Sequence, residues 1–356
     1  MPPISRETRD DSRRHLPLLV IYTGGTIGMV PSKRGLAASP HFEPRLRNAL
    51  VTLPQERRDA LPTFDVIETS PAIDSSAASP HDWQRLADLA KARQSGYKGI
   101  VILHGTDTLA WTASSLAFQL QGIGIPIVVT GAMRPLGSDG SDALDNIEAA
   151  LRFASCPELQ EVAVCFAGKL TRATRTRKQH THALDAFDSP NLAPIGELVD
   201  HHPVIKPSRT LAAQGRPAPP TAADYQTLHP SAVARIVLWP GIDAKLVRQW
   251  LSNAHVRGAL LEVWGGGNIP DDSALANTLA EASASGRLLA AISQCPKGEI
   301  SIGAYAASHS LENANVLSGG DMTPEAAMTK LFHLLALPIS HEARRHRFMA
   351  SLAGER

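Results

Sequence analysis

The fold is decided first by IYTGGTIGMV, residues 21–30, where an apolar run ends in two glycines that lie between two threonines. The apolar residues that precede the glycines, in LPLLVIY, are typical of a buried strand. Glycines directly after a strand let another group approach the backbone closely, and the threonines bring hydroxyl groups to the same place. The stretch therefore predicts a strand whose carboxyl end carries a site.

Apolar runs of strand length recur along the first half of the chain. They lie at 16–22, 64–68, 98–103, 125–130 and 161–167. Helical stretches separate them: one opens with Ser-Pro and ends with a glycine, as an amphipathic helix does, and a second follows the fourth run. These helices are expected at 79–96 and 142–154. The alternation predicts an open, doubly wound, flavodoxin-like α/β domain with a mainly parallel sheet.

The composition changes beyond this domain, where a segment rich in proline and small residues is typical of a linker. Further strands are expected at 234–240, 258–264 and 288–294, and further helices at 243–254, 271–286 and 323–338. Two domains also suit a chain of 356 residues, which is too long for one ordinary core. We therefore predict a disordered tail over 1–15, an N-terminal domain over 16–205, a linker over 206–231 and a smaller C-terminal α/β domain over 232–356.

Charge and composition narrow the class of protein. The formal net charge is +1 and charges of both signs are interspersed, so neither a nucleic acid nor a membrane is expected as a partner. The apolar runs are too short to span a bilayer, and the charged N-terminus lacks the apolar segment of a secretory signal. Three cysteines without a C-x-x-C pair complete the prediction of a cytoplasmic protein.

Polar motifs follow the expected strands at the edge where an open α/β sheet binds its ligands. HGTDT follows the third run, TGAMRP follows the fourth, and the fifth leads to GKLTRATRTRKQHTH. Two hydroxyl clusters bounded by glycines, an acid and several cations are therefore expected at the same sheet edge as TGGTIG. Together these motifs predict an active site at that edge.

Several familiar kinds of site do not match these motifs. The sequence contains no G-x-G-x-x-G or P-loop to bind phosphates, and no G-x-S-x-G nucleophile elbow. It contains no H-E-x-x-H metal motif, and its paired histidines lie in polar loops. These pairs are His180 with His182 and His201 with His202. We therefore expect no metal site.

A threonine nucleophile remains, and it needs a base to remove its proton. A lysine amine serves as a base when burial and neighbouring groups lower its pKa, and a carboxylate beside it can orient it. HGTDT supplies Thr106 next to the acid Asp107. The basic segment supplies Lys178, while Lys169 remains open as an alternative because spacing alone does not separate the two.

The chain resembles the bacterial L-asparaginases, and most closely their cytoplasmic type I branch, from about Leu18 to the C-terminus. The motifs that carry the resemblance are TGGTIGM, HGTDTLAWTAS, VVTGAMRP followed by SDG, DAFDSPNL, GGGN and SGGDMTPEAAMTKL, in the order of the family. The resemblance implies hydrolysis of the side-chain amide of L-asparagine to L-aspartate and ammonia through a threonyl acyl-enzyme. It also implies that no cofactor is needed.

The resemblance further implies a role for single residues. Thr26 would be the nucleophile, while Thr106, Asp107 and Lys178 would form a second catalytic group in which Lys178 is the base. Asp107 would also bind the α-amino group of the substrate, and Ser75 would hold its α-carboxylate. Further substrate contacts are expected at Asp74, Ser76, Gly105 and Asn268. The asparagine would reach into the active site of a neighbouring subunit, so we expect a homo-oligomer, a dimer or a tetramer, with active sites near the subunit interface.

The sequence departs from the family pattern after the nucleophile. Many relatives carry a tyrosine on the loop that follows the threonine, and this chain has Leu36 there, which lacks a hydroxyl. We expect Tyr305, from the C-terminal domain, to assist Thr26 in its place. The loop over 29–41 mixes proline, glycine and serine, as lids that close over a substrate do.

A second departure concerns regulation. Shortly before GGGN, where type I relatives often have an arginine that binds a second asparagine, this chain has Glu262. A carboxylate there would repel the carboxylate of the effector. We therefore expect no allosteric asparagine site of the usual kind, although Cys295 matches a cysteine near that site.

Three other functions remain open at this point. A glutaminase-asparaginase has the same catalytic residues with a roomier pocket, and one methylene changes discrimination by only about 1–3 kcal/mol. An amidotransferase subunit that supplies ammonia for glutaminyl-tRNA formation shares the motifs, but usually carries an extra N-terminal domain. A catalytically decayed amino-acid-binding protein is favoured by Leu36 alone, and the intact Thr26, Thr106, Asp107 and Lys178 argue against it.

Overall fold

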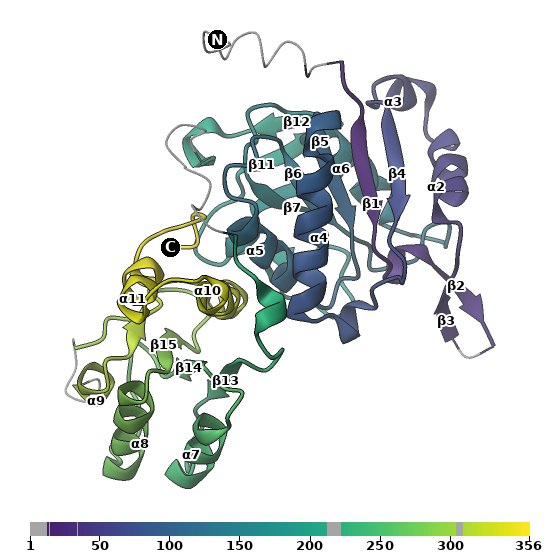
Figure 1. Ribbon diagram of the computed structural model, residues 1–356. Coiled ribbons are helices and arrows are strands. Elements are labelled where there is room, and N and C mark those ends of the chain that lie inside the picture. Colours follow the sequence, from purple (N-terminus) through teal and green to yellow (C-terminus); the bar gives the residue numbers. More distant parts are fainter. Residues whose placement is uncertain (1–12, 14, 34, 212–221, 304–308) are drawn as a thin grey trace, which may run out of the picture. The chain divides into compact units, whose positions relative to one another are not determined.

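A computed structural model describes residues 13, 15–33, 35–211, 222–303 and 309–356 (Figure 1). The tail predicted over 1–15 lies outside the described residues except for positions 13 and 15, and so does the middle of the predicted linker. The chain divides into two compact units. Unit 1 contains the described parts of Met1–Ala78, Arg85–Ser189 and Ala193–Ala218, and unit 2 contains those of Ser79–Gln84, Pro190–Leu192 and Pro219–Arg356.

Unit 1 is built on an eight-stranded sheet with the order β12-β11-β8-β7-β6-β5-β1-β4. The strands are β1 Leu18–Tyr22, β4 Phe64–Glu68, β5 Gly99–Leu103, β6 Ile127–Thr130, β7 Val162–Phe166, β8 Lys169–Arg172, β11 Gly196–Val199 and β12 His202–Ile205. From β4 to β7 all neighbours are parallel, and β8, β11 and β12 extend the sheet in antiparallel pairs. The predicted doubly wound, mainly parallel sheet is therefore confirmed.

Four of the apolar runs in the first half of the sequence correspond to strands that are buried along their whole length, whereas β4, at the edge of the sheet, is only partly buried. In β1, β5, β6 and β7 every residue is buried, because helices cover both faces of the sheet. The helices of unit 1 are α2 Phe42–Val51, α3 Gln55–Asp59, α4 Pro80–Arg93, α5 Leu109–Gln119 and α6 Ala143–Ala154. The first residues of α4 belong to unit 2 and its remainder to unit 1.

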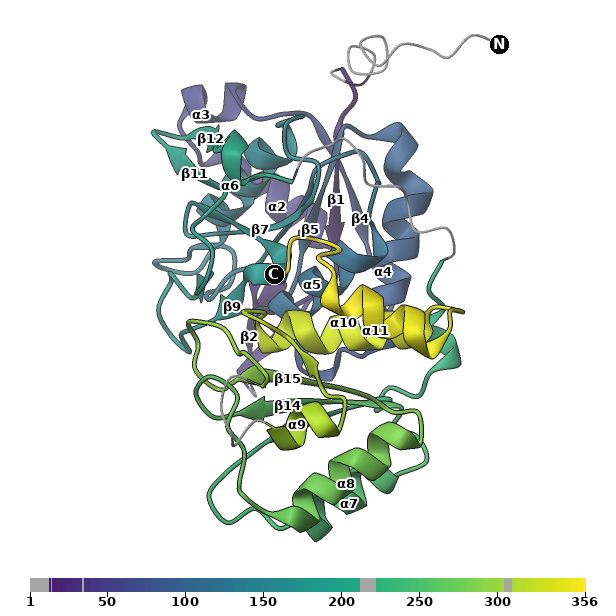
Figure 2. The same cartoon turned by 90° about the vertical axis from the view of Figure 1, so that its left-hand side faces the viewer.

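The crossover from β6 to β7 has an unusual hand. The chain crosses from β4 to β5 and from β6 to β7 in the same direction along the sheet. The first crossover contains α4 and the second contains α6, and Figure 2 shows these helices on opposite faces of the sheet, with α2 and α3 beside α6. Two crossovers that run in one direction on opposite faces have opposite hands. The crossover from β1 to β4 runs the other way along the sheet and carries α2 and α3 on the face opposite α4, so it has the same hand as β4–α4–β5. Because nearly all parallel crossovers are right-handed, the hand shared by these two is the right one, and β6–α6–β7 is left-handed.

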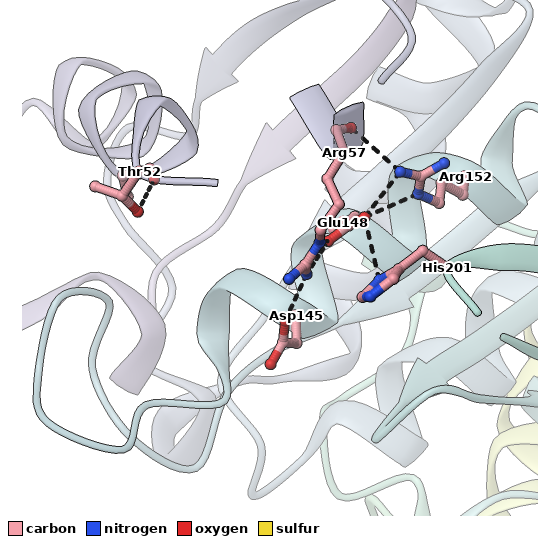
Figure 3. Close-up of polar contacts among 7 residues, drawn as sticks. Thr52, Arg57, Asp145, Glu148, Arg152 and His201 are labelled. Atoms are coloured by element: carbon pink, nitrogen blue, oxygen red, sulfur yellow. Dashed lines mark hydrogen bonds and ion pairs between the residues drawn. The ribbon is translucent and has the colours of Figure 1, made fainter. Parts of the chain in front are cut away.

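A buried carboxylate joins three segments of unit 1 on the face that carries α6 (Figure 3). Glu148 of α6 is fully buried, and its carboxylate accepts hydrogen bonds from Arg57 of α3 and from Arg152 one turn along its own helix. His201, in the turn between β11 and β12, places its Nδ1 3.6 Å from the same carboxylate. Arg57 also donates to Asp145 at 2.8 Å. The hydrogen bond to Glu148 is the main cause of a raised pKa at Arg57.

Removal of this carboxylate should destabilise the fold. A Glu148→Ala substitution leaves Arg57 and the buried Arg152 without their shared partner, and an unpaired charge of this kind costs about 3 kcal/mol of unfolding free energy. Urea unfolding followed by circular dichroism measures the change. The control is Glu197→Ala, which breaks the solvent-exposed pair with Lys206 and should shift the midpoint far less. Equal shifts in the two variants would contradict the expectation.

Unit 2 contains a four-stranded, wholly parallel sheet with the order β13-β14-β15-β16. Its strands are β13 Val233–Val237, β14 Gly258–Val263, β15 Leu288–Ser293 and β16 Leu317–Ser318, and its helices are α7 Ala244–Ser252, α8 Ser273–Ala284, α9 His309–Asn313, α10 Pro324–Ala336 and α11 His341–Met349. The Thr-Pro start predicted for α10 is present, because Thr323 accepts a hydrogen bond from the amide of Ala326. The smaller C-terminal α/β domain is confirmed. Within the described parts of both units, no helix is long and apolar enough to cross a bilayer.

Candidate active site

Three loops of unit 1 meet through their glycines. Strands β1 and β5 are parallel neighbours, so TGGT and HGTD leave the sheet side by side. A Cβ placed on Gly25 would lie 2.3 Å from the Cα of Gly105, and one placed on Gly105 would lie 2.3 Å from Oγ of Ser75. A side chain on Gly25 would collide with the backbone of Gly105, and one on Gly105 would collide with the side chain of Ser75. The glycines therefore bring the segments of Thr26, Thr106 and Ser75 together, and Gly25 also has a φ of +87° that favours glycine.

Thr26 begins a single turn of 3₁₀ helix, Thr26–Gly28, whose carbonyls are bonded from two sides. The amide of Leu136, in the loop that follows β6, donates to the carbonyl of Ile27 at 3.0 Å. Nη2 of Arg45, on α2, donates to the carbonyl of Gly28 at 2.7 Å. Thr26 itself is half-buried. The turn is thus tied to two other segments while the threonine keeps partial access to solvent.

Lys178 reaches the HGTDT loop from a short antiparallel ladder. β9 Arg177–Lys178 pairs with β10 Phe187–Asp188, and Lys178 lies opposite Phe187. Its Nζ donates to Oγ1 of Thr106 at 2.9 Å and to Oδ1 of Asp107 at 2.8 Å. Thr106 is buried, whereas two thirds of the Asp107 side chain is exposed, at 66%. The amine, the hydroxyl and the carboxylate form a set in which a proton can move between lysine and threonine.

Lys169, the alternative base, lies elsewhere in unit 1. It belongs to β8, and its Nζ is 2.5 Å from a carboxylate oxygen of Asp185 in an exposed pair. The geometry therefore brings Lys178, and not Lys169, to Thr106. Spacing could not separate them because both lysines follow β7 in one basic stretch of sequence, and the sequence did not show that Lys169 lies in β8 and Lys178 in the β9–β10 ladder.

The expected carboxylate-binding serine lies in a second 3₁₀ turn, Ser75–Ala77. Ser75 is buried, and its carbonyl accepts a hydrogen bond from Oγ1 of Thr108 at 2.7 Å. Asp74 and Ser76 are exposed and bind each other: Oδ1 of Asp74 accepts from both the amide and the hydroxyl of Ser76, at 2.9 Å each. Asp74 thus serves as the cap of the turn that presents Ser75.

The loop after β6 contains positions that the sequence did not single out. Amides of Met133 and Arg134 donate to the carboxylate of Asp142, at 2.9 and 3.0 Å. Asn146, one turn further along α6, donates to the carbonyl of Gly131 and accepts from the amide of Ala167. Asp142 and Asn146 are both buried. Their i, i+4 spacing on a buried helix is the signal that could have found them.

Two other residues near Thr26 in sequence have clear structural positions. Tyr22 is a core residue: its ring stacks on Phe42 at 4.0 Å between centroids, and burial raises the pKa of its hydroxyl. Leu36 lies in the hairpin of β2 Met29–Ser32 and β3 Gly35–Ala38, and is 49% exposed. The expected irregular lid loop is therefore a two-stranded ribbon, because 29–32 and 35–38 pair in antiparallel register.

Other residues that the sequence singled out, Asn268 and Glu262 among them, belong to unit 2. Asn268 closes a tight turn after β14, where its amide donates to the carbonyl of Trp264 at 2.8 Å. Glu262 is a buried residue of β14 whose carboxylate is bonded by Arg235 of β13. The negative charge at this position is therefore neutralised from the adjacent strand.

Tyr305 lies outside the described residues, so its assistance to Thr26 stays a prediction. In the described ranges, no group of three or more His, Cys, Asp or Glu residues is placed to hold a metal ion.

Comparisons with known proteins cover both units. Residues 17–210 match the family model described as asparaginase, N-terminal, and residues 232–348 match the model of the glutaminase/asparaginase C-terminal domain. The chain is 38% identical over 339 residues to L-asparaginase 1 of Escherichia coli. This alignment covers 95% of this chain and 97% of that protein. It is 29% identical over 368 residues to one component of the glutamyl-tRNA(Gln) amidotransferase from Pyrococcus horikoshii, covering 99% of this chain and 80% of that protein. Among solved structures, L-asparaginase I from Vibrio cholerae matches with a TM-score of 0.82 and 34% identity, covering 96% and 99% of the two chains.

Proposed function

The chain belongs to the asparaginase family, and on that premise we propose that it hydrolyses the side-chain amide of L-asparagine to L-aspartate and ammonia. The observation that carries the proposal is the hydrogen-bonded set of Lys178, Thr106 and Asp107, directly beside the glycine contact that brings in the turn of Thr26. A hydroxyl nucleophile, a base and a carboxylate at one sheet edge suit amide hydrolysis.

In the proposed first half-reaction, Oγ1 of Thr26 attacks the amide carbon of the substrate while its proton passes to a base. The carbonyl oxygen becomes an oxyanion, and backbone N–H groups of the adjoining loops would stabilise it, which is usually a large catalytic contribution. The tetrahedral intermediate then expels ammonia after the leaving nitrogen has gained a proton, and an aspartyl-threonine ester remains.

In the second half-reaction, a water molecule attacks this ester and the roles of acid and base reverse. The contact of Lys178 with the hydroxyl of Thr106 supports the role of a base that delivers its effect through a threonine. Asp107 would bind the α-amino group, and its large exposed fraction suits contact with a substrate. Ser75 would hold the α-carboxylate.

We further propose that the active protein is a homo-oligomer, a dimer or a tetramer, in which Asn268 of one subunit completes the site of another. The proposal draws on family membership. A cytoplasmic location fits the free state of all three cysteines. Sedimentation of the purified protein tests the assembly: a monomer with full activity would contradict it.

The rate of ammonia release tests the proposed activity and its specificity together. The ratio kcat/KM for L-asparagine should exceed that for L-glutamine by at least about tenfold, because one extra methylene in a fitted pocket costs about 1–3 kcal/mol. A coupled assay that consumes the released ammonia gives both values. Equal ratios would favour a glutaminase-asparaginase, and no release from either substrate would favour a binding protein. Turnover of free asparagine without tRNA would argue against an amidotransferase subunit.

A further inference from the structure

Thr108 occupies the position that caps helix α5, yet its side chain makes no cap. A threonine at this position usually accepts a hydrogen bond from an amide of the first helical turn, and this stabilises the helix. Here no such bond is present. The hydroxyl instead donates to the carbonyl of Ser75 at 2.7 Å, across to a different loop of unit 1. The Thr108 side chain therefore bonds a residue distant in sequence, Ser75, instead of capping its own helix.

The turn that receives this bond is otherwise held mainly by local contacts. Within it, the amide of Ala77 donates to the carbonyl of Asp74, and Asp74 caps the turn through Ser76. A single 3₁₀ turn of this length has poor intrinsic stability. The side chain of Ser75 also lies against Gly105, where no Cβ would fit. A bond that fixes the backbone of Ser75 therefore fixes where its hydroxyl lies relative to the HGTDT loop.

We propose that Thr108 is a positioning residue that holds Ser75 in place for the α-carboxylate of the substrate. The inference rests on the proposed function, since it assumes that Ser75 contacts the substrate. Thr108 shares its loop with Thr106 and Asp107, but these two residues bond Lys178 through their own side chains, and Lys178 is placed by the β9–β10 ladder, in which Thr108 takes no part. Loss of the Thr108 hydroxyl therefore weakens substrate binding and leaves the chemical step nearly unchanged.

The test begins with Thr108→Val, which replaces the hydroxyl with a methyl group of similar shape. KM for L-asparagine should rise about tenfold, the size of effect that one lost hydrogen bond produces, while kcat stays within about twofold. Thr108→Ser restores the hydroxyl and should bring KM back toward the wild-type value. The matched control is Thr278→Val in unit 2, which removes a buried threonine hydroxyl that donates to the carbonyl of Ala274 at 2.7 Å. The control should leave KM unchanged.

A double-mutant cycle with Ser75→Ala separates positioning from a general structural effect. If Thr108 acts through Ser75, the rise in KM caused by Thr108→Val should largely disappear once the serine hydroxyl is gone. An unchanged KM in Thr108→Val, a rise that persists in the Ser75→Ala background, or no rescue by Thr108→Ser would each overturn the inference. Should the valine variant fail to fold, Thr108→Ala is carried through the same cycle.

Binding of L-aspartate, measured by calorimetry, keeps this inference distinct from the proposed activity. L-aspartate carries the same α-carboxylate and needs no turnover. If the wild type released no ammonia, the proposed function would fail, yet weaker L-aspartate binding by Thr108→Val, with rescue by Thr108→Ser, would still support the positioning role. If the wild type is active and both variants bind L-aspartate equally well, the positioning role fails alone.

Discussion

A Thr26→Ala variant is expected to lose asparagine hydrolysis almost completely, with kcat reduced roughly 10⁴-fold or more. Alanine has no oxygen to form the ester, so no acyl-enzyme can accumulate. The fold should survive the change, because the turn that contains Thr26 is held through backbone carbonyls bonded by Leu136 and Arg45 rather than through the threonine side chain. Ammonia release in a coupled assay measures the loss.

Two controls make the result specific. Thr26→Ser keeps a hydroxyl at the same position and should retain a measurable part of the activity. The thermal unfolding midpoints of both variants should match that of the wild type. The role of nucleophile would have to be reassigned if Thr26→Ala kept more than about a hundredth of the wild-type kcat, or if mass spectrometry found the acyl group on another residue.

The second large effect on activity is expected at Lys178, one of the two lysines that sequence spacing left as candidates for the base. Lys178→Met should lower kcat by about 10²–10⁴-fold, the range in which a single acid or base contributes. Methionine keeps the length of the side chain but removes the amine that contacts Thr106 and Asp107. Because Asp107 would then lack its cation, KM should also change. Steady-state kinetics over a range of L-asparagine concentrations separates the two parameters.

Lys169→Met is the matched control for this substitution. It removes an amine of the same kind from the same segment, but that amine pairs with Asp185 in an exposed ion pair. Exposed pairs contribute little to stability, so this variant should keep both its kcat and its unfolding midpoint. Similar activity losses in the two variants would show that the segment tolerates neither change, and a loss confined to Lys169→Met would reverse the assignment of the base.

Strands β1, β5, β6 and β7 of unit 1 could be predicted because they are buried on both faces. Burial on both faces requires continuous apolar runs, and such runs are visible without any knowledge of tertiary structure. Helix α5 was not predicted, because in a helix the same burial on all sides removes the pattern that identifies it. All its residues except Trp111 are buried, so its sequence shows no alternation between an apolar and a polar face. The hairpin of β2 and β3 was missed as well, because its strands are short and largely exposed.

The part of the candidate site that lies in loops at strand ends could be predicted from the sequence. TGGT and HGTD follow adjacent parallel strands, and the topology alone brings them together. The residues that position these loops were not predictable in this way. Arg45 and Thr108 act on carbonyls far away in sequence, and nothing in the local pattern distinguishes them from an ordinary helix arginine or an ordinary cap. The choice between Lys169 and Lys178 likewise depended on a two-residue ladder that is too short to leave a periodic signal.

The left-handed β6–α6–β7 crossover has a consequence for the time at which the site can form. The loop between β6 and α6 bonds the turn of Thr26 through Leu136, and Lys178 comes later still in the chain. During synthesis at about 5–20 residues per second, Thr26 leaves the ribosome roughly eight to thirty seconds before Lys178. We therefore expect the reactive threonine to spend that interval without its base. The newly made chain should acquire hydrolytic activity no earlier than the point at which the β6–α6–β7 crossover has formed and Lys178 has emerged.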